Sequence, residues 1–63
     1  MAKRKTYTVN SEPGLNVREN PSMDAQILRV LSDGEKITVD PNAETDGWKA
    51  LTDGGFVMAK YLK

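Results

Sequence analysis

The sequence contains neither cysteine nor histidine in its 63 residues. Without cysteine the chain forms no disulfide and offers no thiolate nucleophile, and without histidine it lacks the most common general base and zinc ligand. It also has no apolar run close to the ~20 residues of a membrane span or the ~7 to 15 residues of a signal-peptide core. We therefore expect no membrane partner and no cofactor.

Charge of one sign is also missing, because nine Lys and Arg residues balance nine Asp and Glu residues. A net charge of zero attracts a polyanion only weakly, so nucleic acid is not an expected partner. Hydrophobic residues make up 38% of the chain and charged residues 29%, which is typical of a folded domain rather than a disordered one. A chain this short forms one domain with a thin core and little room for a water-poor catalytic cleft, so no enzyme activity is expected.

Turn signals divide the chain into short segments. The segments between them are too short for ordinary helices, and most carry β-branched or aromatic residues or alternate apolar with polar residues. Leu15 and Val17, separated by Asn16, show the two-residue period of a half-buried strand. The sequence therefore predicts an all-β domain with strands over residues 5–9, 15–18, 27–31, 36–39, 48–52 and 56–58.

The connections between these segments indicate a small barrel. Asp33-Gly34 and Asp53-Gly54 are spaced as two-residue hairpins with type I′ turns, in which both residues take a positive φ. The polar stretches 19–25 and 41–47 are predicted as exposed loops, and residues 59–62 as one helical turn. Five to six short antiparallel strands bury their apolar faces by curling into a closed barrel, which also removes exposed edges. An OB-type barrel would need longer strands and more residues.

Residues 15–22 read Leu-Asn-Val-Arg-Glu-Asn-Pro-Ser and resemble the opening of the bacterial SH3-like (SH3b) domain family, in which Leu-Asn-Val-Arg is followed after two residues by Pro-Ser. Asn20 stands where the family usually has Gly, but Asn also tolerates a left-handed backbone. The last hairpin, over residues 51–56, is shorter than is usual in the family. Further similar blocks extend the resemblance over about residues 7–62: 27–34, 36–39, 47–51 and 55–62.

The resemblance implies an SH3b-like barrel over residues 6–63, preceded by a flexible basic N-terminal segment over residues 1–5. It implies a non-catalytic binding module of the kind attached to peptidoglycan hydrolases and other envelope proteins. Such a module engages cell-wall peptide or directs an attached hydrolase to the envelope. We therefore expect a monomeric domain of a larger bacterial or phage protein, located in the cell envelope or outside the cell, whose partner is a cell-wall peptide, another protein or an attached catalytic domain.

A shallow groove for an extended peptide needs flat rings and hydrogen-bonding side chains. Tyr7, Trp48 and Tyr61 are expected to provide stacking walls. The five donors of Arg18 are suited either to the carbonyls of the following loop, which is the favoured interpretation, or to an acidic group. The predicted ligand-binding residues are Tyr7, Asn16, Arg18, Glu19, Asn20, Trp48 and Tyr61.

Two other classes of function remain open. A structural spacer that packs on a neighbouring domain or subunit would expose a contiguous apolar patch around Trp48, Phe56 and Met58. A barrel that binds DNA or RNA would need a basic stripe beside exposed aromatic rings. A calcium-loop spacing begins at Asn42 and ends at Asp53, but it lacks the first Asp, the final Glu and the flanking helices, so we expect no metal site.

Overall fold

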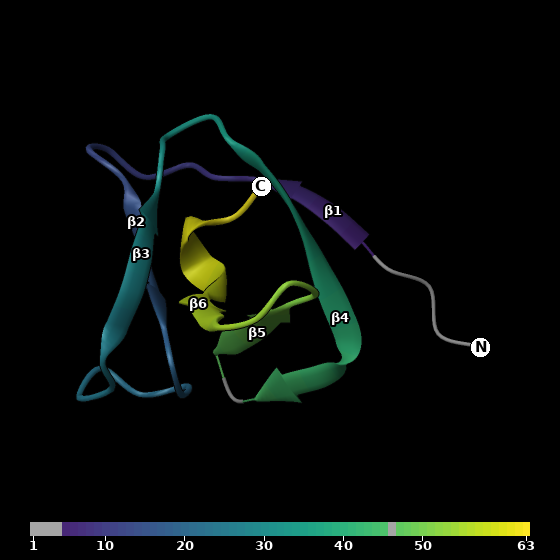
Figure 1. Cartoon of the computed structure of the whole chain (residues 1–63). Helices are drawn as coiled ribbons and strands as arrows, with labels where there is room; N and C mark the ends of the chain where they lie inside the picture. Colours follow the sequence, from purple (N-terminus) through teal and green to yellow (C-terminus); the bar gives the residue numbers. More distant parts are fainter. Residues whose placement is uncertain (1–4, 46) are drawn as a thin grey trace.

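One antiparallel sheet of six strands makes up most of the computed structural model, which describes residues 5–45 and 47–63 (Figure 1). The sheet is strongly curled, and this confirms the predicted all-β fold with one helical turn near the C-terminus. Within those residues, no helix has the length and apolar character needed to cross a membrane. The elements are β1 (Lys5–Thr8), β2 (Leu15–Arg18), β3 (Ile27–Leu31), β4 (Lys36–Thr45), β5 (Trp48–Leu51), β6 (Phe56–Met58) and the 3₁₀ turn η1 (Ala59–Tyr61).

The alternation in the sequence determines which side chains enter the core. Leu15 and Val17 of β2 are 4% and 0% exposed, while Asn16 between them is exposed. Because successive residues of a strand point to opposite faces, β2 and β4 each contribute alternate apolar side chains to the interior of the curled sheet, whereas β3 contributes only Leu31. The resulting core cluster consists of Val9, Leu15, Val17, Leu31, Ile37, Val39, Leu51 and Val57.

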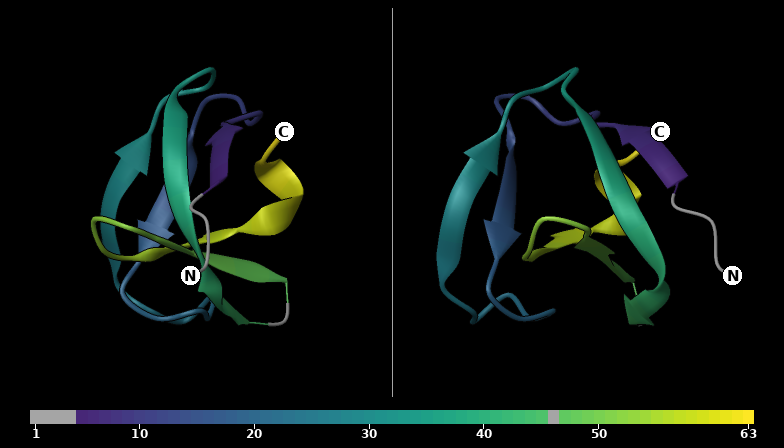
Figure 2. Two further views of the ribbon diagram at one scale, coloured as in Figure 1. Left: turned by 90° about the vertical axis from the view of Figure 1, so that its right-hand side faces the viewer. Right: turned by 45° about the vertical axis from the view of Figure 1, so that its right-hand side comes forward.

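The two ends of the described chain meet and close one side of the fold. Val9 forms an isolated antiparallel bridge with Leu62, and Thr8 exchanges two backbone hydrogen bonds with Lys63. Figure 2 shows the C-terminal segment beside the N-terminal strand in both views. Tyr7 and Tyr61, which come from these two ends, both pack against the core cluster.

The predicted hairpin at Asp33-Gly34 is wrong. The strand order is β1-β4-β5-β6-β2-β3, so β3 pairs with β2, and β4 pairs with β1 and β5. Residues 32–35 do form a turn, in which Glu35 N–H donates to the Ser32 carbonyl, but this turn carries the chain across the fold. It is held instead by Val9, whose N–H donates to Glu35 O and whose carbonyl accepts from Gly34 N–H. The Asp33-Gly34 dipeptide therefore predicted the turn correctly but did not predict which strands pair on its two sides.

The hairpin between β5 and β6 is confirmed, although its turn is not of type I′. Gly54 N–H donates to Leu51 O, and Leu51 N–H donates to Gly55 O. Positive φ occurs at Gly54 (108°) and Gly55 (93°), and no described residue other than glycine has a positive φ. Two adjacent glycines occupy the positions that need a positive φ, so Asp53 does not have to adopt one.

Residues 41–47 were predicted as an exposed loop. Pro41, Asn42 and Gly47 are exposed, but most of the segment is strand rather than loop. β4 continues to Thr45 with an irregular register after Asp40, and Thr45 pairs with Trp48. The connection to β5 is therefore much shorter than predicted. Polar composition did not prevent strand formation here, because β4 pairs with β5 at Asp40 and again at Thr45 through backbone groups that every residue carries.

The sheet does not remove its edges, as a fully closed barrel would. β1 and β3 stand at its two ends, and among the described strands β3 pairs only with β2. Of the segment expected to be flexible, residues 1–4 lie outside the described residues, and Lys5 pairs with Val39 as the first residue of β1.

Candidate functional site

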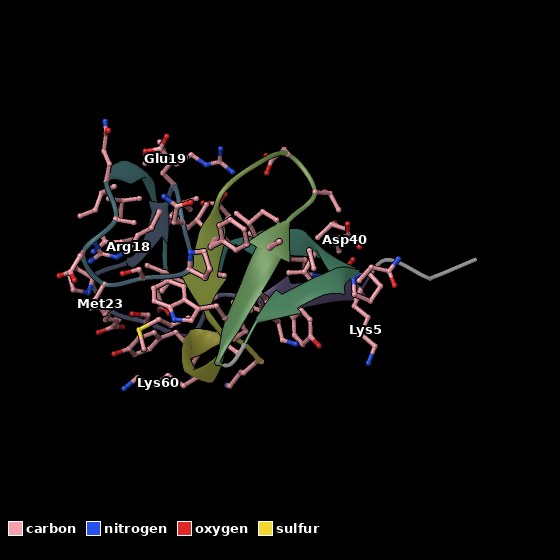
Figure 3. The ribbon with its side chains drawn as sticks, turned by 90° about the horizontal axis from the view of Figure 1, so that it is seen from below. Lys5, Arg18, Glu19, Met23, Asp40 and Lys60 are labelled. Atoms are coloured by element: carbon pink, nitrogen blue, oxygen red, sulfur yellow. The ribbon has the colours of Figure 1, made fainter. Side chains whose placement is uncertain are left out.

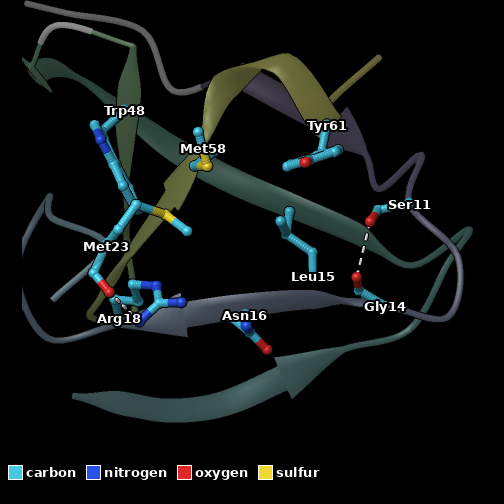
Figure 4. Close-up of a pocket in the computed structure, with 9 residues that line it drawn as sticks. All are labelled: Ser11, Gly14, Leu15, Asn16, Arg18, Met23, Trp48, Met58 and Tyr61. Carbon is cyan, nitrogen blue, oxygen red and sulfur yellow. Dashed lines mark hydrogen bonds between the residues drawn. The ribbon is translucent and has the colours of Figure 1, made fainter. Parts of the chain in front are cut away.

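A pocket of about 170 Å³ lies where β2 and the loop after it face β5, β6 and η1 (Figure 4). We call it the Trp48 pocket. It opens to solvent between the β2–β3 loop on one side and the C-terminal elements on the other. Its lining residues are Ser11, Gly14, Leu15, Asn16, Arg18, Met23, Trp48, Met58 and Tyr61.

Trp48 reaches the pocket because of its register in the sheet. It is paired with Met58 across β5 and β6, so the two side chains lie on the same face and line the same wall. The Trp48 side chain is only 8% exposed. The Trp48 indole N–H has no hydrogen-bond acceptor among the described residues. Since no buried side-chain nitrogen or oxygen of those residues lacks a partner, this N–H is open to solvent. The Trp48 ring and the Met58 side chain thus form an apolar wall of the pocket.

Arg18 builds the opposite wall. It is the last residue of β2, and its Nη1 donates to the carbonyls of Met23 and Ala25, each at 2.9 Å. The loop is also closed by a hydrogen bond from Glu19 N–H to Gln26 O at 2.9 Å. The favoured interpretation of Arg18 as a tie to the carbonyls of the following loop is confirmed. These bonds hold the loop so that Met23, whose side chain is 60% exposed, lines the pocket beside Trp48.

The floor and the far end come from shorter segments. Asn16 projects from the outer face of β2 opposite Val30, and its amide has no hydrogen-bond partner in the described part of the chain.

Ser11 Oγ donates to Gly14 O at 2.8 Å. A Cβ at Gly14 would lie 2.7 Å from Leu31 O, so only glycine fits where the chain passes β3. Tyr61, in η1, carries the Lys60 ammonium 5.1 Å from its ring centroid.

Four of the seven predicted residues, Asn16, Arg18, Trp48 and Tyr61, line this pocket together. Glu19 and Asn20 belong to the loop but do not line it. Tyr7 lines a different hollow with Lys5 and Asp40, and the Lys49 ammonium lies 5.3 Å from its ring centroid. Figure 3 shows Lys5 and Asp40 at the opposite end of the molecule from Arg18 and Met23.

Sequence reasoning missed Met23 and Met58 as lining residues, together with Ser11, Gly14 and Leu15. The signal for Met58 was its pairing with Trp48, which requires knowing the register of β5 and β6. Met23 could be assigned to the loop, but its direction depends on the Arg18 hydrogen bonds.

The residues that line the pocket are mostly apolar, and a few of them carry polar groups. Arg18 is the only residue among the lining residues that is charged at neutral pH. No group of three or more Asp, Glu, His or Cys side chains that could hold a metal occurs among residues 5–45 and 47–63. What the pocket presents is a set of flat or flexible apolar walls and several donors without protein partners.

Comparison of the sequence with known proteins identifies the family of this chain. The family model described as bacterial SH3 domain matches residues 13–63. The chain is 38% identical over 66 residues to "Probable endopeptidase p60" of Listeria seeligeri, and the aligned region covers 98% of this chain and 12% of that protein. It is 40% identical over 65 residues to the protein of the same name from Listeria monocytogenes serovar 1/2a, with 97% of this chain and 13% of that protein covered. The chain thus spans about an eighth of the length of these curated relatives, and it belongs to the bacterial SH3 domain family.

Proposed function

We propose that this domain is a non-catalytic module that binds a cell-wall peptide in the Trp48 pocket. The observation that carries the proposal is the combination of apolar walls from Trp48, Met23 and Tyr61 with free donors on Arg18 and Asn16. A peptide bound in extended form presents both kinds of partner, because its backbone needs hydrogen bonds and its side chains need apolar contacts. The p60 relatives are named as probable endopeptidases, which supports a peptide as the target, and the cell wall is the location that the family resemblance implies.

The small size of the pocket limits how tightly it holds a ligand. Its volume of about 170 Å³ is below the ~300 to 1,000 Å³ typical of sites that enclose a drug-sized molecule. It therefore accommodates a segment of a few residues and leaves the rest of the peptide in solvent. Affinity should be modest, because much of the contact free energy is spent on ordering the peptide.

We attribute the endopeptidase chemistry that the relatives' name implies to parts of those proteins that this chain does not match. The chain has no cysteine or histidine to act as nucleophile or base. The proposed role is to bring an attached catalytic domain to its substrate in the cell envelope or outside the cell. In this role the domain acts as a monomer, and its binding energy raises the local concentration of the attached domain near the wall.

Sedimentation of the domain with purified bacterial cell walls tests the proposal. Met23→Ala and Tyr61→Ala remove two walls of the pocket and should each lower the bound fraction, while circular dichroism stays unchanged. Val30→Ala is the matched control for Met23→Ala, because Val30 is 61% exposed against 60% for Met23 and does not line the pocket. Undiminished binding by both pocket variants would contradict the proposal.

Trp48 requires a milder change than alanine. Truncating a side chain that is 8% exposed removes about 3–5 kcal/mol of packing and would unfold a domain of this size. Trp48→Phe keeps an aromatic wall and removes the indole N–H. We expect weaker wall binding with a folded spectrum.

A structural spacer is the second candidate, and one observation favours it. The exposed large hydrophobic side chains of the described residues are Met23, Ile27, Leu28 and Val30, with 44–61% exposure, and they lie within eight residues of sequence. The patch expected around Trp48, Phe56 and Met58 is not among them, because Trp48 is buried and the other two are half-buried. Failure to bind walls, together with dimerisation that Val30→Lys abolishes, would favour the spacer.

A further inference from the structure

The charge of the Trp48 pocket has one sign. Arg18 carries the only charge among the lining residues, and it forms no salt bridge with any described residue. The carboxylates of Glu19 and Asp24 belong to the adjacent loop, but neither residue lines the pocket. In Figure 3, Glu19 and Met23 lie on either side of Arg18. The Lys60 ammonium, which lies 5.1 Å from the Tyr61 ring centroid, adds a second positive charge near the rim.

The guanidinium of Arg18 is only partly used by the protein. Its five N–H groups form a planar fork, and Nη1 spends both of its own on Met23 O and Ala25 O. Nε and Nη2 have no acceptor in the described residues. Since no buried side-chain nitrogen of those residues lacks a partner, Nε and Nη2 both reach solvent. The edge formed by Nε and Nη2 is one of the two guanidinium edges that bind the two oxygens of a carboxylate at once.

The loop carbonyls also fix this edge before any ligand arrives. An arginine normally loses side-chain freedom when it binds a carboxylate, and this loss offsets part of the interaction. Arg18 has already lost much of it to the two bonds at 2.9 Å. Carbonyl acceptors leave the full positive charge in place, whereas a neighbouring carboxylate would neutralise it. The site is therefore complementary to an anion and not to a peptide ammonium group.

We infer that the Trp48 pocket selects its peptide by a carboxylate group, which pairs with the Nε and Nη2 edge of Arg18 while the adjoining apolar part of the peptide rests on Met23 and Trp48. The inference rests on the proposed function and adds the ligand class to it. Conversion of the carboxylate to a carboxamide keeps the shape of the ligand but removes its charge. The wall peptide therefore binds less tightly when it is amidated.

The experiment compares two forms of one probe. Purified muropeptides are used either with free carboxylates or after conversion of the carboxylates to carboxamides, and binding is followed by chemical-shift changes of the domain. We expect the free acids to bind roughly five- to tenfold more tightly than the amides. Raising the salt concentration from about 0.05 to about 0.5 M should weaken binding of the acids and leave that of the amides nearly unchanged.

A pair of variants assigns the effect to one residue. Arg18→Gln removes the charge and should make the acid and the amide bind equally. Arg29→Gln is the matched control, because Arg29 lies on β3 and does not line the pocket. It should keep the wild-type preference. A preference that survives in Arg18→Gln would overturn the assignment.

The wild-type comparison stands even if Arg18→Gln loosens the loop. Equal binding of acid and amide by the wild-type domain, or tighter binding of the amide, would overturn the inference and leave the proposed function intact. Binding of neither form, together with failure to sediment with cell walls, would overturn the proposed function itself.

Discussion

Val9 and Leu62 form an antiparallel bridge that joins the beginning of the described chain to its end. Val9 is 1% exposed and belongs to the core cluster, and its backbone also holds the turn at residues 32–35 through bonds to Gly34 and Glu35. One residue therefore connects the N-terminal segment, the crossing from β3 to β4 and the C-terminus. The consequence is that the stability of the domain depends on contacts between parts of the chain that are far apart in sequence.

Val9→Ala should lower the free energy of unfolding by about 2–3 kcal/mol, because it removes buried methyl groups and leaves a cavity where three segments meet. Urea denaturation followed by tryptophan fluorescence measures the change. Val30→Ala, at a side chain that is 61% exposed, should change stability by less than about 0.5 kcal/mol. Equal effects of the two substitutions would contradict the central position of Val9.

The adjacent glycines of the β5–β6 turn should respond differently to alanine. Gly54 has a positive φ with open space around its missing Cβ, so Gly54→Ala should cost about 1–2 kcal/mol from backbone strain alone. Gly55 also has a positive φ, and a Cβ there would collide with the Val17 side chain in the core. Gly55→Ala should therefore cost clearly more. Thermal denaturation of both variants tests the order, which would be wrong if Gly54→Ala proved the more damaging.

Arg29 and Asp53 form a salt bridge of 2.9 Å between β3 and the β5–β6 turn, yet it should contribute little to stability. The two side chains are 42% and 72% exposed, so water and salt screen their attraction. We expect a coupling free energy below about 1 kcal/mol from a double-mutant cycle of Arg29→Gln and Asp53→Asn. A coupling of several kcal/mol would show that the bridge is essential for holding β3 in place.

Arg18 should matter more for the order of its loop than for the stability of the barrel. Arg18→Met removes both bonds to the carbonyls of Met23 and Ala25 and keeps the apolar part of the side chain. The amides of Glu19 and Ala25, which are bonded within the loop, should then exchange with solvent at least several-fold faster. Amides of the core residues Val17 and Val57 serve as internal controls. Unchanged protection of the loop amides would show that Arg18 does not hold the loop.

The candidate site was predictable where it depended on local pattern. Asn16 and Arg18 were recognised because alternation in β2 assigns their side chains to the face opposite the buried Leu15 and Val17. Trp48 and Tyr61 were recognised because a groove for an extended peptide needs flat rings as stacking walls. Tyr7 was expected to provide a third stacking wall of the same groove, but its ring lies at a separate hollow, with the Lys49 ammonium 5.3 Å from its centroid.

The sequence by itself determined that the domain is all-β, roughly where the six strands begin, and which side chains of β2 face the core, because the two-residue period and the turn residues act over a few neighbouring positions. Only the tertiary structure decided that β3 pairs with β2 and not β4, that β4 extends to Thr45, and that Met23 and Met58 join Trp48 around one pocket. Pairing and register join residues that are distant in sequence, and they are settled by how the whole curled sheet buries its apolar face. No local pattern carries that information.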